Sequence, residues 1–168
     1  QAIGTGVFMD LGEAGATIKG EMAGDEFGHA LACLGDVDGD GLDDLLAASP
    51  GNDYSGIYAG RSYLFLGSDM PLGDVEMSAS SAAWRLHGED LSDQSGASLG
   101  RGGDIDGDGL ADLLIGSWAH SENGQFSGRS YVMLASDLGT SSNIDLGSVS
   151  TVIDGISERS RAGFNLAG

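Results

Sequence analysis

The feature that most constrains this chain is a nine-residue acidic loop that occurs twice. The first copy reads DVDGDGLDD at residues 36–44, and the second reads DIDGDGLAD at residues 104–112. Both copies place Asp at loop positions 1, 3, 5 and 9 and Gly at positions 4 and 6. Carboxylates packed this densely repel one another, so the loop is expected to close around a cation. Calcium suits the pattern because Ca²⁺ takes about six to eight oxygen ligands from carboxylates and backbone carbonyls.

The spacing predicts one Ca²⁺ site in each loop, two in all. The ligands expected in the first loop are four carboxylates and the backbone carbonyl at position 7, that is, Asp36, Asp38, Asp40, Leu42 and Asp44. The equivalent ligands in the second loop are Asp104, Asp106, Asp108, Leu110 and Asp112. The glycines permit the positive φ angles that so tight a loop needs. The two leucine side chains are expected to turn inward, and Asp43 at position 8 is expected to be a bystander, since the second copy has Ala111 there.

A helix–loop–helix calcium site begins with the same acidic run but closes with a bidentate Glu at position 12. Position 12 is Ala47 in the first loop and Ile115 in the second, and neither side chain can bind a metal. The short apolar runs at 45–48 and 113–116 resemble strands more than helices. We therefore expect calcium loops between strands. An acidic turn without a metal is the competing interpretation, and the repeated spacing argues against it.

Composition limits the classes of partner. The net charge of −19 repels the phosphates of nucleic acids and of anionic lipids, so we expect neither a nucleic-acid partner nor membrane insertion. With 30 glycines and 2 prolines among 168 residues, the chain is expected to form short strands and tight turns. Cys33 is the single cysteine, so an internal disulfide is excluded and a metal is the expected staple. No signal peptide is visible at Gln1.

The whole chain repeats with a period of 67–68 residues. The segment GRSYLFLGSD at 60–69 recurs as GRSYVMLASD at 128–137. A third copy starts near the end, where IDG at 153–155 matches LHG at 86–88. We expect residues 1–20 to end a preceding repeat with its outer strand. A first full blade at 21–88, a second at 89–155 and the first strand of a truncated third repeat at 156–168 would follow.

Each period is expected to hold four strands, at 28–34, 45–49, 61–66 and 83–87 in the first repeat, with loops between them. A four-stranded antiparallel meander cannot bury both of its faces alone. Radial packing of such blades gives a β-propeller, which closes with about four to eight blades. The chain is thus predicted to be all-β, with about 2.5 repeats of a larger or oligomer-completed propeller. Whether the segment 4–11 matches a third strand or the linker near 75–77 stays open.

The flanking motifs identify a known repeat. Phe27-Gly28 precedes the first loop, and Ala48-Ser49-Pro50 follows it. The second loop lies between Ser95-Gly96 and Gly116-Ser117-Trp118. Together with the loop pattern, these motifs resemble the FG-GAP repeat of integrin α-subunit propellers and their bacterial relatives. The resemblance implies calcium loops on one face of a propeller of usually seven blades. It implies a ligand surface on the opposite face, here in segments 50–60, 89–94 and 119–128.

Single residues favour recognition over catalysis. The histidines are His29, His87 and His120, and the repeats replace the first two with unrelated residues, as expected of non-catalytic positions. No nucleophile elbow, phosphate loop or zinc-type cluster is present in the sequence. The candidates for contacting a ligand are Tyr54, Tyr58 and His120. Arg61 and Arg129 recur at one position, and each is expected to pack its stem on a blade and pair with an acidic loop.

The sequence therefore predicts a non-enzymatic, calcium-binding propeller module for adhesion or for recognition of a protein or glycan. Sites of extracellular affinity imply a secreted or cell-surface location. The partners are then a protein or glycan ligand, or further copies or segments that complete the propeller. Two alternatives stay open: an accessory propeller of a secreted hydrolase or lyase, and a structural protein that assembles into rings or fibres.

Overall fold

The computed structural model describes residues 16–70 and 75–166, and its regular elements are short strands and single 3₁₀ turns. The strands are β1 (Ala16–Lys19), β2 (Leu31–Gly35), β3 (Asp44–Ser49), β4 (Arg61–Phe65), β5 (Val75–Ser78), β6 (Trp84–His87), β7 (Ser98–Gly103), β8 (Asp112–Ser117), β9 (Arg129–Met133), β10 (Asn143–Asp145) and β11 (Thr151–Asp154). The 3₁₀ turns are η2 (Gly67–Asp69), η3 (Ala79–Ser81), η4 (Ala135–Asp137) and η5 (Leu146–Ser148). Among the residues described, no helix has the length and apolar character needed to cross a membrane.

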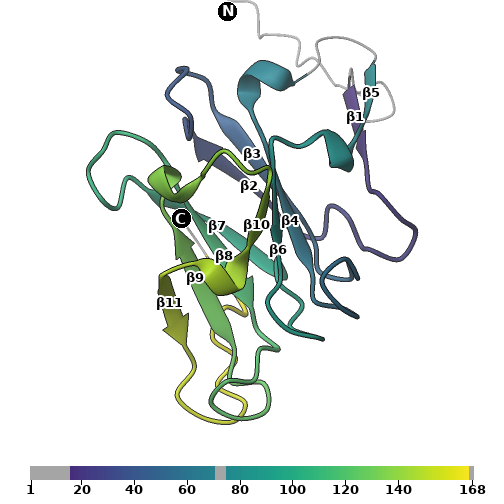
Figure 1. Cartoon of the computed structure of the whole chain (residues 1–168), viewed down its shortest axis with the longest axis vertical. Coiled ribbons are helices and arrows are strands. Elements are labelled where there is room, and N and C mark those ends of the chain that lie inside the picture. Colours follow the sequence, from purple (N-terminus) through teal and green to yellow (C-terminus); the bar gives the residue numbers. More distant parts are fainter. Residues whose placement is uncertain (1–15, 71–74, 167–168) are drawn as a thin grey trace, which may run out of the picture.

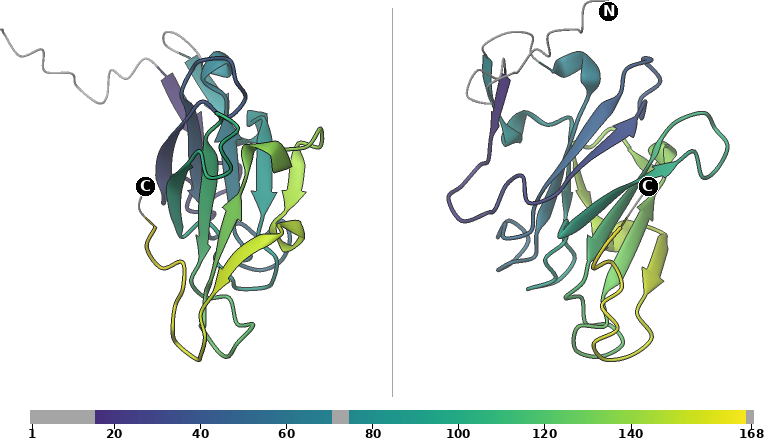
Figure 2. Two further views of the ribbon diagram at one scale, coloured as in Figure 1. Left: turned by 90° about the vertical axis from the view of Figure 1, so that its left-hand side faces the viewer. Right: turned by 180° about the vertical axis from the view of Figure 1, so that it is seen from behind.

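Two antiparallel meanders form the body of the molecule. Strands β2, β3, β4 and β6 pair in chain order in the first sheet, and β7, β8, β9 and β11 pair in the same way in the second. The two sheets lie face to face and twist together (Figures 1 and 2). This arrangement confirms the prediction of an all-β chain built from propeller blades.

Two details of the prediction are wrong. The first strand begins at Leu31 rather than at residue 28, because Gly28 has φ of +85° and turns the chain. The amide of Gly28 instead donates to the carbonyl of Ala48 at 2.9 Å, which joins the two flanking motifs directly. The stretch 67–81 was expected to be a loop, but within its described part it holds η2, β5 and η3.

The second repeat has the same elements between its third and fourth strands, in η4, β10 and η5. Strand β10 leaves its own blade and pairs in parallel with β6, the outer strand of the first blade. The indole nitrogen Nε1 of Trp84 on β6 donates to the carbonyl of Gly139 at 3.0 Å. We call residues 139–149 the strap. Strand β5 pairs with β1 in the same parallel way, so in both repeats this strand pairs with the strand that precedes its own blade in the chain.

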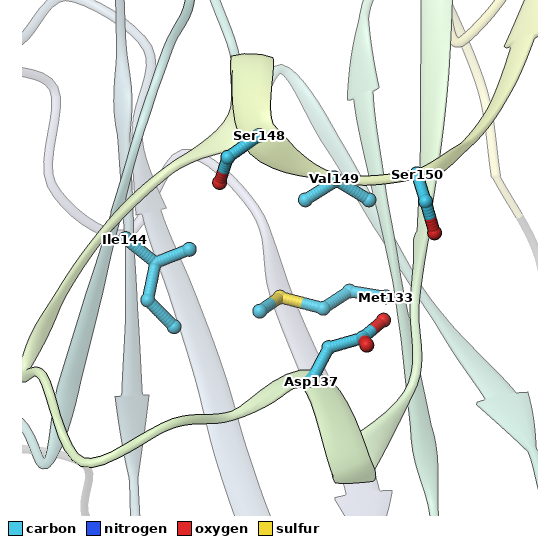
Figure 3. Close-up of a pocket in the computed structure, with 6 residues that line it drawn as sticks. All are labelled: Met133, Asp137, Ile144, Ser148, Val149 and Ser150. Carbon is cyan, nitrogen blue, oxygen red and sulfur yellow. The ribbon is translucent and has the colours of Figure 1, made fainter.

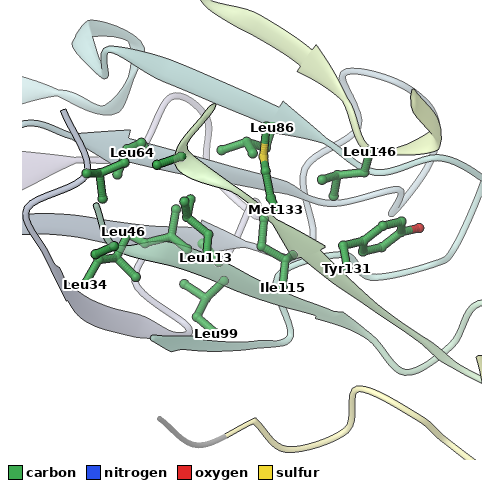
Figure 4. Packing of buried hydrophobic residues seen from close by; sticks show 14 residues of the cluster. Leu34, Leu46, Leu64, Leu86, Leu99, Leu113, Ile115, Tyr131, Met133 and Leu146 are labelled. Carbon is green, nitrogen blue, oxygen red and sulfur yellow. The ribbon is translucent and has the colours of Figure 1, made fainter. Parts of the chain in front are cut away.

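The main core lies between the two sheets (Figure 4). Both blades contribute to it, together with the strap; its fully buried members include Leu34, Leu46, Leu64, Leu86, Leu113, Ile115, Tyr131, Met133 and Leu146. A second cluster on the other face of the first sheet contains Tyr63 and Phe65, against which Ile18 and Phe27 pack. The alternation of Tyr63, Leu64 and Phe65 between two cores follows from the two-residue period of a strand.

The loops gather at the two ends of the sheets (Figures 1 and 2). The acidic loops join β2 to β3 and β7 to β8 at one end. The connections that run from β4 to β6 and from β9 to β11 start at the same end, where the amides of Gly67 and Ala135 contact Asp44 and Asp112. The opposite end, which we call the loop face, comprises residues 20–30, 50–60, 88–97, 118–128 and 155–166. The segment 4–11 lies outside the described residues, and the assignment of residues 1–20 to a preceding repeat stays a prediction.

Candidate functional site

Each acidic loop folds around its first aspartate. Asp36 accepts the amide of Gly39 at Oδ1 (2.6 Å) and the amide of Gly41 at Oδ2 (2.9 Å). Asp104 accepts the amides of Gly107 and Gly109 in the same way, at 2.7 and 3.0 Å. The first two of these glycines have φ of +86°, a conformation that residues with a Cβ rarely adopt. The positive φ angles expected from the sequence are thus present in both loops.

The loop fold brings three carboxylates together. One oxygen from each of Asp36, Asp38 and Asp40 lies within 4.8 Å of the other two. The second loop repeats this arrangement with Asp104, Asp106 and Asp108. An all-oxygen donor set of this kind is the one that Ca²⁺ prefers.

The aspartate at loop position 9 has a different environment. Asp44 is fully buried, and its two oxygens accept the amides of Val37 and Gly67, each at 2.8 Å. Burial raises the pKa of the Asp44 carboxyl, against the effect of these two amides. Asp112 repeats the contacts with Ile105 and Ala135. Each carboxylate oxygen has two lone pairs, so these hydrogen bonds leave capacity for a cation.

The leucines at position 7 differ between the loops. The side chain of Leu42 is 49% exposed, so the expectation that it turns inward is wrong. Leu110 is half-buried and packs against the main core. Asp43, the expected bystander, is exposed. The backbone carbonyls of both leucines stay predicted ligands.

The first acidic loop also contacts the second blade. The carbonyl of Asp36 accepts the amide of Ala111 at 2.7 Å. Val37 is 2% exposed and belongs to the core between the sheets, whereas its counterpart Ile105 is 52% exposed. A cation that orders the first loop would therefore also stabilise the junction between the blades.

On the loop face, a recurring clamp joins each blade to the chain that enters it. Arg61 Nη1 lies 2.6 Å from Glu21 Oε2, and the hydroxyl of Tyr63 donates to the same oxygen at 3.1 Å. Burial raises the pKa of Tyr63 to about 12, and the Glu21 carboxylate adds to the shift. The second blade repeats the clamp among Arg129, Glu89 and Tyr131. The sequence predicted that both arginines pair with an acidic loop; each has an acidic partner, but this is a glutamate of the loop face rather than a residue of the acidic loops.

Tyr54, a predicted contact residue, lies on a polar platform. Its ring stacks on His87 with centroids 4.4 Å apart, and the guanidinium of Arg61 lies 4.2 Å from the Tyr54 centroid. Burial lowers the pKa of His87, and the positive charge of Arg61 lowers it further. Tyr54 itself is 67% exposed, so its outer surface is open to a partner.

Tyr58 and its counterpart Phe126 lie on the loop face, and both have a positive φ angle, of 54° and 58°, which is strained for residues with large side chains. Tyr58 is 53% exposed. Phe126 stacks on Trp118 at 5.6 Å, and Phe164 meets the same indole edge-on at 6.2 Å. Bulky residues at positive φ persist only where their surroundings enforce the conformation, and such residues cluster at binding sites.

His120 does not lie on the surface. It is 1% exposed, and its Nδ1 lies 2.7 Å from Oδ2 of Asp93, which is 3% exposed. The hydrogen bond with Asp93 raises the pKa of His120, in opposition to burial. Within the described ranges no hydroxyl is bonded to Nε2, so a Ser–His–Asp relay is not assembled there. The sequence offered no sign of the Asp93 contact, because 27 residues separate the two positions.

A pocket of about 200 Å³ lies between the strap and the second blade (Figure 3). Met133 points into it between Ile144 and Val149. Its polar groups are the carboxylate of Asp137 and two serine hydroxyls. It therefore offers neither a set of metal ligands nor a base beside a nucleophile.

Comparison with known proteins agrees with this geometry. The FG-GAP repeat family matches residues 27–65 and 95–133, which span the two acidic loops and the strands around them. Integrin alpha-PS5 of Drosophila melanogaster is 37% identical over 97 residues, 56% of this chain. Integrin alpha-X of Mus musculus is 36% identical over 109 residues, 61% of the chain. Integrin alpha-5 of Xenopus laevis is 32% identical over 122 residues, 70% of the chain.

The similarity covers a small part of these relatives. The matched region spans 9% of integrin alpha-PS5 and 11% of integrin alpha-5.

Proposed function

Because this chain carries two FG-GAP repeats of the integrin-like family, we propose that it is a calcium-stabilised, non-enzymatic recognition module of a β-propeller. The observation that carries this proposal is the pair of acidic loops, which close in the same way in both blades. Three clustered carboxylates per loop repel one another, and a divalent cation would remove that repulsion. Asp36, Asp38, Asp40 and Asp44 would hold the ion in the first loop, and their counterparts would hold it in the second.

The role of calcium in this proposal is structural. An ion that binds the closed loop but not the open chain stabilises the fold by RT ln(1 + [Ca²⁺]/Kd). At about 10⁻³ M Ca²⁺ and a Kd of about 10⁻⁴ M, this is roughly 1.4 kcal/mol per site. Sites of that affinity are filled outside the cell, which supports a secreted or cell-surface location.

The recognition surface in this proposal is the loop face. It exposes several large apolar side chains from different connections, namely Met22, Tyr54, Ile57, Tyr58, Leu91 and Phe164. Exposed apolar side chains gathered on one face suit a protein or glycan partner. Adhesion is the use that the integrin-like repeats favour.

Calorimetric titration of the metal-free protein with Ca²⁺ tests the calcium assignment. We expect two ions to bind, and we expect Asp38→Asn and Asp106→Asn each to remove one of them. Asp43→Asn is the matched control, because it changes one charge in the same loop at the position where the second loop has Ala111. Two ions bound by the Asp38→Asn, Asp106→Asn double variant would contradict the assignment.

A further inference from the structure

The loop face holds a second group of ligating side chains, separate from the acidic loops. Asp90 and Asp93 belong to the connection between β6 and β7, and His120 belongs to the connection between β8 and β9. One ring nitrogen of His120 and one carboxylate oxygen of each aspartate lie within 4.8 Å of one another. Two connections of the second repeat thus converge on one point with three potential ligands.

Two of these three side chains are buried, and the third is exposed to solvent. His120 and Asp93 are 1% and 3% exposed, while Asp90 lies at the surface. His120 Nδ1 contacts Asp93 Oδ2, which also accepts the amide of Asp90 at 3.2 Å. Nε2 of His120 is buried without a hydrogen-bond partner among the described residues.

The first blade shows which residues are enough to join the two connections by a hydrogen bond. Its residues at the three equivalent positions are Met22, Asp25 and Asn52. Asn52 Nδ2 donates to Asp25 Oδ2 at 2.6 Å, so an amide is enough to join the two connections. The second repeat has Asp in place of Met and His in place of Asn. Both differences add a metal ligand, and both fall at positions that meet in space.

The donor set indicates the class of ion. An imidazole nitrogen with two carboxylates suits Zn²⁺ and similar transition-metal ions, whereas Ca²⁺ prefers oxygen ligands throughout. Two carboxylates and a neutral imidazole would balance the charge of a divalent ion. Arg129 is nearby, but it is already paired with Glu89 and Asp154. These two carboxylates offset its positive charge and reduce its repulsion of a bound cation.

We propose that Asp90, Asp93 and His120 form a third metal site, which binds a divalent transition-metal ion of the Zn²⁺ type. The ion binds Nδ1 of His120 in place of the proton that joins this nitrogen to Asp93. A protonated imidazole releases that proton to solvent, and a neutral imidazole carries its single proton on Nε2 instead, so the bound ring is neutral in both cases. Three protein ligands leave a fourth position of a tetrahedral ion for water. The bound ion ties the β6–β7 connection to the β8–β9 connection and so rigidifies this part of the loop face. The site does not depend on calcium in the acidic loops.

Calorimetric titration of the Ca²⁺-saturated protein with Zn²⁺ tests the site. We expect one Zn²⁺ to bind without release of Ca²⁺. His120→Asn and Asp90→Met carry the residues of the first blade, and each is expected to weaken Zn²⁺ binding at least tenfold. Titration with Co²⁺ adds a spectroscopic readout, since its visible absorption on binding should be lost in the same two variants.

His29→Asn is the control, because it removes an exposed histidine that lies 3.7 Å from Glu26 and belongs to the connection between β1 and β2, outside the three ligating residues. Circular dichroism without Zn²⁺ establishes that each variant is folded, and either variant alone decides the question. Zn²⁺ binding unchanged in the folded variants, lost in His29→Asn, or seen only as displacement of Ca²⁺ would overturn the proposal.

Discussion

Arg61 and Arg129 occupy the same position in successive repeats, yet they have different neighbours. Arg61 pairs with Glu21, which follows β1, and Arg129 pairs with Glu89, which follows β6. Arg61 also donates a hydrogen bond to Nδ1 of His87, whose environment favours the neutral imidazole. Arg129 instead donates two hydrogen bonds to Asp154, at 2.6 and 3.0 Å. The Asp154 carboxylate raises the pKa of Arg129, and Arg129 lowers the pKa of Asp154. One position thus supports either a neutral or an ionic contact.

The clamp on Glu89 should contribute measurably to stability. Glu89→Ala leaves the buried hydroxyl of Tyr131 without its acceptor and removes one anion from Arg129. We expect a loss of about 2 kcal/mol in the free energy of unfolding, measured by urea denaturation. Glu76→Ala is the control, because Glu76 pairs with Lys19 at the surface, where both side chains are more than half exposed. That change should cost less than about 0.5 kcal/mol, and equal losses in the two variants would contradict the clamp.

His87 should make the fold less stable in mild acid. Its pKa in the folded protein is lowered by burial and by Arg61, so below about pH 6.5 the unfolded chain binds the proton more readily. The free energy of unfolding therefore falls as the pH falls, with a slope of at most about 1.4 kcal/mol per pH unit for one proton.

His87→Asp copies the second blade and isolates this effect. An aspartate beside Arg61 stays ionised between pH 7.5 and pH 5, as Asp154 does beside Arg129. We expect urea denaturation at these two pH values to show a smaller loss of stability in the variant than in the original protein. The two proteins differ only at residue 87, so a difference in their pH dependence reports on that position. An identical loss in both would rule out His87 as the source.

Among the structural elements, the acidic loops were predicted well and the strap was missed. Residues 36–44 and 104–112 carry their own geometry, because local hydrogen bonds from glycine amides to the first aspartate define the turn. Strand β10 has one apolar residue among three, so its sequence shows no alternation of apolar and polar residues that would indicate a strand. Its pairing with β6 depends on a partner from another blade. The Asp93–His120 contact escaped prediction for the same reason, since it depends on two connections that meet only after folding.

The strap is expected to be anchored by one side chain. Leu146 in η5 is fully buried in the core between the blades, although it comes from a stretch that reads as a loop. Leu146→Ala should lower the free energy of unfolding by about 2–4 kcal/mol, the usual cost of a large-to-small change in a core. Ile156→Ala is the control, since that side chain is 91% exposed. Equal effects on the midpoint of urea unfolding would mean that the strap is not anchored there.

At the scale of the whole molecule, one blade face is covered and its counterpart is open. Leu86 on β6 is fully buried because the second blade packs over it. Ile153 occupies the equivalent place on β11 and is 60% exposed. The same residue position is therefore core in one blade and surface in the next. Closure of a β-propeller would place a further blade over Ile153.

The open face should make the isolated chain associate with itself. We expect light scattering to show a mass that rises with protein concentration, because a face built to be buried will find another apolar surface. Ile153→Lys should shift the chain toward the monomer by placing a charge in that contact. Ile156→Lys adds the same charge on the loop face and should leave the association unchanged. A monomer at every concentration, or an equal response to both changes, would show that this face does not drive contact between blades of separate copies.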